Sequence, residues 1–351
     1  MIEQILKEAV DKNASDIFMV AGMPLSIKIN GIIQHLDEEK LLPSNVEQYI
    51  QEIYRMNDNR NMDYLLLHGD DDFSFSIPHL SRFRISVLKQ RGSFGAVIRI
   101  VRFTLPDPKD LHIPESVMNI ANLRKGFVLV TGSAGNGKST TLACIIDRIN
   151  QTRNAHIITL EDPIEYLHRH NKSVVTQREI GQDTDSYMSG LRACLRQAPD
   201  VILLGEMRDY ETIKTAITAA ETGHLVISTL HTTGVSNTID RIIDVFPPNA
   251  QSQIRVQLAM VLQMIVSQQL VPAIDGSLVP AFEIMPVNEA VRTMIRESKS
   301  HQLANVIATG ASSGMLSMNH SLLELQEKGI ISEETRKKYS MTQSQPSTFY
   351  F

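Results

Sequence analysis

Residues 132–139 read Gly-Ser-Ala-Gly-Asn-Gly-Lys-Ser and match the P-loop pattern at every fixed position. An apolar run at residues 127–130 precedes them, and a helix-compatible run at residues 140–149 follows. This order suits a phosphate site, because the backbone N–H groups of the loop and the N-terminus of the helix both attract anions. The predicted nucleotide-binding residues are Gly132, Ser133, Ala134, Gly135, Asn136, Gly137, Lys138, Ser139 and Thr140.

Two side chains of this segment have separate expected tasks. Lys138 would neutralise the outer phosphates of a nucleoside triphosphate, and the hydroxyl of Ser139 would hold Mg²⁺. The competing interpretation is a glycine-rich turn between a strand and a helix, with a lysine on the surface. The strand before the loop and the helix behind it favour the nucleotide site.

A second apolar run, at residues 201–204, leads into Gly205 and Glu206. Open α/β sheets bind their ligands at the carboxyl ends of the strands, so we expect Glu206 at that edge, as in a Walker B strand. A glutamate is long enough there to reach Mg²⁺ or its bound water. The competing interpretation is a solvated charge at the end of a strand.

Residues 157–165 show the same pattern of an apolar run followed by acidic residues. The expected strand places Glu161 and Asp162 at the same edge of the sheet as Glu206, and Pro163 then ends the strand. Hydrolysis of a nucleoside triphosphate needs a group that accepts a proton from the attacking water or orients it. Glu161 is the candidate for this group. Without the neighbouring motifs, an ordinary Glu-Asp-Pro loop would be the better interpretation.

His231 follows a fourth apolar run, at residues 225–228, after a helical pattern that Asp209 can cap and Gly223 can end. We expect His231 just past the end of this strand, where a sensor of the γ-phosphate would lie. A single histidine at the end of a strand is more often structural. The assignment therefore depends on the other motifs.

Four apolar runs, at residues 127–130, 157–160, 201–204 and 225–228, alternate with longer helical patterns. This alternation predicts an α/β fold with a mainly parallel sheet covered on both faces. Residues 1–103 instead begin with a short amphipathic helix and continue as short strands, with a hairpin signal at Asn30-Gly31. They predict a separate α+β domain.

Prolines at positions 106, 108 and 114 predict a linker at residues 104–114, because proline interrupts both helices and sheet ladders. The predicted organisation is an N-terminal domain at 1–103, this linker, and a nucleotide-binding domain with C-terminal helices at 115–340. A polar tail at 341–351 receives no role.

Composition narrows the functional classes. The chain has 351 residues, 42% of them hydrophobic and 21% charged, which predicts about two globular domains. A net charge of −5 provides no basic field for a nucleic acid, so none is expected as a partner. The two cysteines, Cys144 and Cys194, suit a reducing compartment and cannot form a four-cysteine zinc site.

No targeting or membrane-spanning segment is expected. The start of the chain is charged within its first eight residues and lacks the features of a signal peptide. The most apolar later run, at residues 258–271, is interrupted by three glutamines and falls short of the roughly 18 apolar residues of a membrane span. We predict a cytoplasmic protein whose membrane contact is peripheral.

The P-loop and the segments at residues 158–165, 203–209 and 228–233 resemble, in this order, the Walker A, Asp box, Walker B and His box motifs of the type II/IV secretion ATPase superfamily. The resemblance extends from Ala14 to about Gly329. It implies a PAS-like N-terminal domain joined to a RecA-like P-loop ATPase core. It also implies ATP and Mg²⁺ as cofactors and assembly as a homohexameric ring.

Within this superfamily, the chain is most similar to the twitching-motility ATPases that retract type IV pili. The pilus-assembly and type II secretion ATPases usually carry a long extra N-terminal region and a four-cysteine zinc module, whereas this chain starts at the PAS-like domain. In addition, residues 290–297 read Ala-Val-Arg-Thr-Met-Ile-Arg-Glu and resemble a C-terminal motif of the retraction ATPases. An ordinary amphipathic helix is the competing interpretation of this octet.

The resemblance also assigns catalytic arginines. Arg84 and Arg99, on neighbouring predicted strands of the N-terminal domain, match arginines that family members place over the nucleotide. A guanidinium there would stabilise the charge that develops during phosphoryl transfer. By sequence alone, each is more often a surface residue of a strand. Arg241 is a weaker candidate for reaching the site of a neighbouring subunit.

One departure from the family lies at residues 14–19, which read Ala-Ser-Asp-Ile-Phe-Met where the family usually has Ala-Ser-Asp-Leu-His-Leu. The missing histidine is far in sequence from the nucleotide motifs. It therefore leaves the ATPase interpretation intact and weakens only the expected details of subunit contacts.

The sequence thus predicts an ATP-driven hexameric motor for pilus retraction, with ATP bound between its two domains. The resemblance implies a pilus platform protein in the inner membrane as partner. One alternative is a motor of the same chemistry for pilus assembly or type II secretion. A second is a weakly hydrolysing nucleotide-binding regulator of such a motor, and a third is a RecA-like DNA motor, which the net charge disfavours.

Overall fold

The computed structural model describes residues 2–29, 31–101 and 105–340. They divide into two compact units. The first comprises Met1–Thr104 with Ile164–Leu167, and the second comprises Leu105–Pro163 with His168–Phe351. The domain limits at 103 and 115 and the linker between them remain predictions. Thr104 of that linker and the tail at 341–351 lie outside the described residues.

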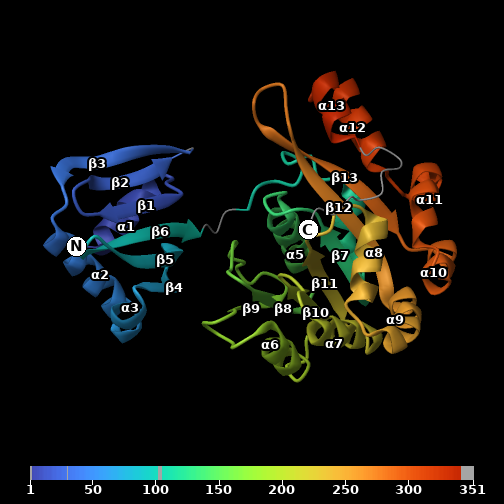
Figure 1. Ribbon diagram of the computed structural model, residues 1–351, viewed down its shortest axis with the longest axis horizontal. Helices are drawn as coiled ribbons and strands as arrows, with labels where there is room; N and C mark the ends of the chain where they lie inside the picture. The colour runs from blue at the N-terminus through green and yellow to red at the C-terminus, as the bar shows by residue number, and fades with distance from the viewer. Residues whose placement is uncertain (1, 30, 102–104, 341–351) are drawn as a thin grey trace. The chain divides into compact units, whose positions relative to one another are not determined.

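The first unit has an antiparallel sheet and helices that pack against it (Figure 1). Its elements are α1 (Ile2–Asp11), β1 (Asp16–Val20), β2 (Pro24–Ile29), β3 (Ile32–Lys40), α2 (Pro43–Met56), α3 (Asp63–His68), β4 (Asp70–Ile77), β5 (Ser81–Gln90) and β6 (Ser93–Val101). The six strands lie in the order β3-β2-β1-β6-β5-β4. Alternate residues of β5, among them Phe83, Ile85 and Val87, are buried in a core shared with α1 and α2.

The hairpin predicted around Asn30-Gly31 is the antiparallel pair β2–β3, in which Ile29 lies opposite Ile32. Asn30 itself lies outside the described residues. The predicted α+β character of this part of the chain is confirmed.

The second unit is an α/β fold. Its strands are β7 (Gly126–Thr131), β8 (His156–Glu161), β9 (Val174–Glu179), β10 (Val201–Leu204), β11 (Leu225–Leu230), β12 (Leu262–Pro272) and β13 (Leu278–Pro286). They form one sheet in the order β13-β12-β7-β11-β10-β8-β9, in which only the β12–β13 pair is antiparallel. Every residue of β7, β10 and β11 is buried, because helices cover both faces. The predicted fold class is confirmed.

The helices of this unit lie on both sides of its sheet (Figure 1). They are α4 (Glu115–Met118), α5 (Lys138–Thr152), α6 (Tyr187–Cys194), α7 (Tyr210–Glu221), α8 (Val235–Asp244), α9 (Pro248–Val261), α10 (Glu289–Arg296), α11 (Leu303–Thr309), α12 (Met318–Glu327) and α13 (Glu333–Tyr339). Helix α5 packs in one apolar core with Val128 and Val266. Helices α7, α8 and α9 pack in another with Leu129 and Ile265, on the opposite face of the same strands.

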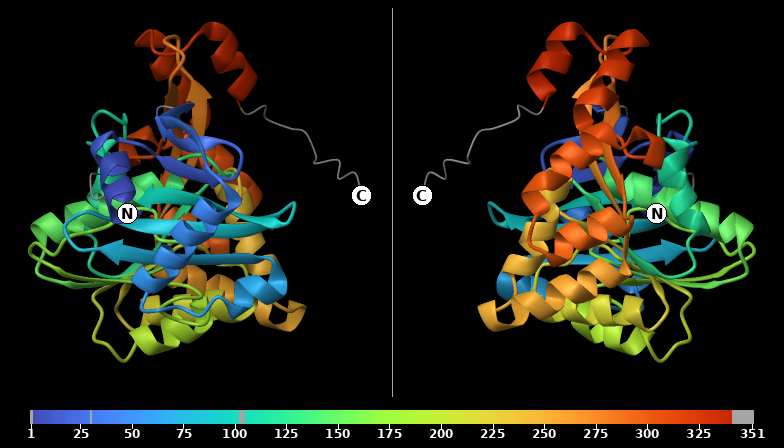
Figure 2. Two further views of the ribbon diagram at one scale, coloured as in Figure 1. Left: turned by 90° about the vertical axis from the view of Figure 1, so that its left-hand side faces the viewer. Right: turned by 90° about the vertical axis from the view of Figure 1, so that its right-hand side faces the viewer.

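Strands β12 and β13 form a long hairpin beside the C-terminal helices of the described chain (Figure 2). The backbone N–H of Phe282 in β13 donates to Oγ of Ser321 in α12 at 3.0 Å. The apolar run at residues 258–271 thus comprises the end of α9 and most of β12. Among the described residues, no helix combines the length and apolar character that crossing a membrane requires.

Candidate functional site

The predicted phosphate loop connects the end of β7 to the start of α5. Gly132, Gly135 and Gly137 have φ values of 143°, 79° and 75°, which side chains with a Cβ rarely allow. Gly137 is also the N-cap of α5. The glycines of the motif therefore occupy positions whose backbone conformation only glycine adopts easily. The loop that they form ends at the N-terminus of α5.

Lys138 is folded against this loop. Its Nζ donates to the backbone oxygens of Gly132 at 2.7 Å and Ser133 at 3.0 Å, and only 8% of the residue is exposed. The ammonium group thus lies among the backbone groups that would surround a phosphate. Its position fits the role predicted from the sequence.

The strand that carries His231 lies directly beside β7. Leu230 is paired with Thr131, and the backbone N–H of Gly132 donates to the oxygen of Leu230 at 3.3 Å. His231 and the phosphate loop therefore leave neighbouring strands at the same edge of the sheet. This is the edge where open α/β sheets bind ligands.

Glu206 contacts two basic side chains at this edge. Its Oε2 lies 3.1 Å from Nε2 of His231, and its Oε1 lies 2.5 Å from the guanidinium of Arg208. The hydrogen bond to Glu206 raises the pKa of Arg208. Glu206 is 8% exposed, so these contacts compensate a carboxylate that is largely removed from water. The structure brings Glu206 and His231 into contact, and it adds Arg208 to them.

Glu161 is the last residue of β8. Its Oε1 accepts hydrogen bonds from Oγ1 of Thr159 at 2.6 Å and from Nε2 of Gln177 at 3.2 Å. Glu161 is half-buried, whereas Thr159 is fully buried. These two donors orient one oxygen of the carboxylate. Gln177 comes from β9, a strand that sequence analysis did not identify.

Tyr187 lies close to the acidic groups at this edge. Burial raises the pKa of its hydroxyl, and the charges of Glu206, Asp162 and Glu161 add to this rise. A Cβ built on Gly205 would lie 2.8 Å from the Tyr187 hydroxyl and 3.4 Å from Cα of Glu161. The phenol therefore stays neutral and lies against Gly205, beside the acidic groups. The sequence motifs did not predict this residue.

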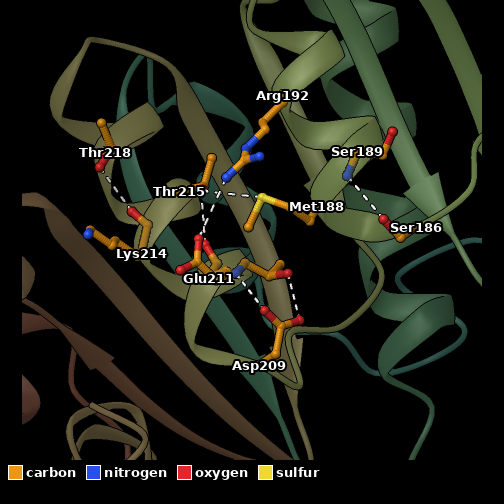
Figure 3. A network of polar contacts seen from close by, with 10 residues as sticks. Ser186, Met188, Ser189, Arg192, Asp209, Glu211, Lys214, Thr215 and Thr218 are labelled. Carbon is orange, nitrogen blue, oxygen red and sulfur yellow. Dashed lines mark hydrogen bonds and ion pairs between the residues drawn. The ribbon is translucent and has the colours of Figure 1, made fainter. Parts of the chain in front are cut away.

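Polar contacts join α6 and α7 (Figure 3). Oγ of Ser186 caps α6 by accepting from the N–H of Ser189 at 3.1 Å, and Asp209 caps α7. Between the helices, Oγ1 of Thr215 lies 3.7 Å from Sδ of Met188, and Arg192 lies 3.6 Å from Glu211. These contacts join α6, whose first residue is Tyr187, to α7.

Arg84 and Arg99 lie directly opposite each other on β5 and β6 of the first unit. Nε of Arg99 lies 3.0 Å from Oδ1 of the buried Asp16, while 66% of the Arg99 side chain is exposed. The structure thus confirms that these arginines are neighbours on adjacent strands. Their action on a nucleotide stays a prediction, as does the role of Arg241 in α8.

A cavity of about 180 Å³ adjoins the start of α5. It is lined by residues 110–113, by Gly137, Thr140 and Thr141, and by residues of the β12–β13 hairpin. Within the described part of the chain, no group of three or more His, Cys, Asp or Glu side chains could hold a metal. Ser139 and Glu206 offer oxygen atoms, the ligand type that Mg²⁺ prefers.

The sequence profile described as "Type II/IV secretion system protein" matches residues 1–345. A protein of Pseudomonas aeruginosa named "Type IV pilus retractation ATPase PilT" is 41% identical over 337 residues, which cover 96% of this chain and 97% of the relative. A "Twitching motility protein" of Neisseria gonorrhoeae is 40% identical over 96% of this chain and 90% of its own length.

Solved structures agree with these relatives. The structure titled "Crystal Structure of the Pilus Retraction Motor PilT and Bound ADP" is similar with a TM-score of 0.88 and 44% identity, covering 97% of this chain and 96% of the other. The Legionella pneumophila ATPase DotB gives a TM-score of 0.81 at 29% identity, covering 96% of this chain and 94% of its own. The similarity thus includes both units of the chain.

Proposed function

The chain belongs to the type II/IV secretion system protein family, and we propose that it is an ATP-hydrolysing motor that retracts type IV pili. One observation carries the proposal: a phosphate loop whose glycines have positive φ values lies beside the Glu206–His231 contact at one edge of a mainly parallel sheet. The relatives named for pilus retraction and twitching, similar over nearly the whole chain, support the biological role.

In the proposed site, the loop amides and Lys138 bind the phosphates of ATP. Glu161 orients the attacking water, and His231 senses the outer phosphate. Ser139 and Glu206 are the residues that would hold Mg²⁺. When bound, this ion would neutralise part of the negative charge of the phosphates. Arg84 and Arg99 are proposed to stabilise the charge that develops on the transferred phosphoryl group.

We further propose that six copies form a ring in the cytoplasm, peripherally associated with the inner membrane. ATP binding and hydrolysis would change the arrangement of the ring and move a platform protein of the pilus. A pilus-assembly or secretion motor has the same chemistry, so the direction of work must be tested in cells.

The test replaces the chromosomal copy in the host by the Lys138→Ala variant and scores surface pili and twitching. A retraction motor predicts cells that keep or accumulate pili and no longer twitch. Bald cells would show an assembly motor instead, and unchanged pili and twitching would contradict both. Lys125→Ala is the matched control, because Lys125 is an exposed lysine just before β7.

A further inference from the structure

Gln268 is a buried polar residue that none of the sequence motifs includes. It is 2% exposed and follows Ser267, the residue of β12 that pairs with Thr131 at the end of β7. Strand β12 therefore continues past the end of β7, alongside the phosphate loop. A buried amide in this position requires partners, because an unpaired one would cost free energy.

The side chain of Gln268 finds a partner on the helix behind the loop. Oγ1 of Thr141 donates to Oε1 of Gln268 at 2.8 Å, and Thr141 is 1% exposed. On the other side of the amide, Nε2 of Gln268 lies 3.0 Å from the position that a Cβ on Gly137 would occupy. The amide thus fits between the first turn of α5 and the last glycine of the loop.

The backbone of the same strand contacts the loop at two more places. A Cβ on Gly132 would collide with the backbone oxygen of Gln268, so strand and loop approach as closely as glycine allows. Two residues further along β12, the N–H of Leu270 donates to Oδ1 of Asn136 at 3.0 Å. Contacts from β12 therefore reach the beginning, the middle and the end of the phosphate loop.

Resting on the function proposed above, we propose that Gln268 is a positioning residue of the nucleotide site. Its amide fixes the first turn of α5 against Gly137 through Thr141 and holds the loop in the conformation that binds phosphate. The affinity for the phosphate groups therefore depends on a residue of a neighbouring strand that acts through Thr141 and the loop.

The experiment measures binding of Mg²⁺-ADP, and of Mg²⁺-tripolyphosphate by competition, to the full chain. Gln268→Met keeps the volume and removes the amide, and Thr141→Val removes the donor from the opposite side. Loss of one such hydrogen bond predicts about tenfold weaker binding of both ligands. Because both changes break the same contact, the double variant should bind no more weakly than the worse single variant.

Gln269→Met is the matched control, because Gln269 has the opposite orientation on the same strand and should leave both affinities unchanged. Thermal unfolding of each variant shows whether the fold is retained, and Thr141→Val gives an independent reading should Gln268→Met fail to fold. Weaker binding of ADP alone would show contact with the nucleoside and overturn the proposal.

Equal affinity of the variants and the wild type would also overturn the proposal, as would additive losses in the double variant. Failure of the wild-type protein itself to bind ADP would instead contradict the proposed function. The two failures are therefore distinguishable.

Discussion

Nε2 of His231 lies 3.1 Å from Oε2 of Glu206, so residues separated by 25 positions in the chain meet at the edge of the parallel sheet. His231 follows β11 and Glu206 follows β10, which is the neighbouring strand. The contact joins a carboxylate near the phosphate loop to a side chain that follows the neighbouring strand.

Replacement of His231 by alanine should lower the rate of phosphate release by tenfold or more, because hydrogen bonds to charged groups contribute about 1.5–3 kcal/mol. The affinity for ADP should change little. His320→Ala is the control, since His320 is about as exposed as His231 and lies 3.3 Å from Glu324, a carboxylate that is far more exposed than Glu206. An unchanged rate in His231→Ala would remove His231 from the mechanism.

Alanine at Gly132 should destabilise the phosphate loop through two effects. The φ of 143° disfavours a Cβ, and the added atom would collide with the backbone of β12. Gly276→Ala separates the two effects, because Gly276 has a φ of 84° and open space around it. Gly276→Ala should cost about 1–2 kcal/mol of stability, and Gly132→Ala should cost more and also abolish ADP binding. Nucleotide binding retained by Gly132→Ala would contradict the described loop.

The first unit contains an ionic contact with a buried carboxylate. The carboxylate of Asp71 accepts from Nε of Arg60 at 3.0 Å and from the hydroxyl of Tyr54 at 2.8 Å, and its side chain is 2% exposed. Arg60 also lies 4.9 Å from the centre of the Phe73 ring. Removing the arginine would leave a carboxylate buried without its counter-charge.

Arg60→Ala should therefore lower the free energy of unfolding by about 3 kcal/mol. Arg148→Ala breaks an exposed ion pair with Glu115 and should cost less than about 1 kcal/mol. Urea unfolding followed by circular dichroism measures both. Equal losses of unfolding free energy in the two variants would show that the buried Asp71 contact stabilises the protein no more than the exposed Glu115 pair does.

Glu283 gives a prediction about pH. Its Oε2 accepts from the N–H of Val235 at 2.8 Å, at the start of α8, and burial raises its pKa in the folded protein. The folded state therefore binds this proton more tightly than the unfolded chain does. The resulting stability is present below the unfolded pKa of about 4.3 and is lost as pH rises through the folded value.

Glu283→Gln removes this titration. The unfolding temperature of the variant relative to the wild type should therefore rise as pH is increased from about 4 to 7, because only the wild type then carries a buried charge. Thermal unfolding of the wild type and the variant across this pH range shows whether the difference in unfolding temperature rises as expected. A difference that is constant with pH would mean that Glu283 titrates alike in both states.

The central strands and the glycine loop could be predicted from the sequence because each follows a local rule. Continuous apolar runs of four to six residues give buried parallel strands, and the loop has a fixed glycine spacing. The family resemblance was equally accessible, since the four motifs are contiguous segments, and the profile match and the relatives confirm it. The roles of Glu161, Glu206 and His231 in catalysis stay predictions.

The supporting residues could not be found in this way, because their partners are distant in sequence. Gln268 and Thr141 are 127 positions apart, and the glutamine appears in the sequence only as an interruption of an apolar run. Tyr187 begins the short helix α6, and its hydroxyl approaches Gly205 only in the folded chain. Such contacts depend on the packing of whole elements, for which no local pattern exists.

The most direct test of the account is steady-state phosphate release from Mg²⁺-ATP by the purified full chain, compared with its Lys138→Ala and Glu206→Gln variants. The wild type should turn over ATP, and both changes should abolish this turnover while thermal unfolding shows that the fold is retained. A wild type as inactive as its variants would support a regulator without hydrolysis, and turnover unaffected by either change would contradict the proposed site.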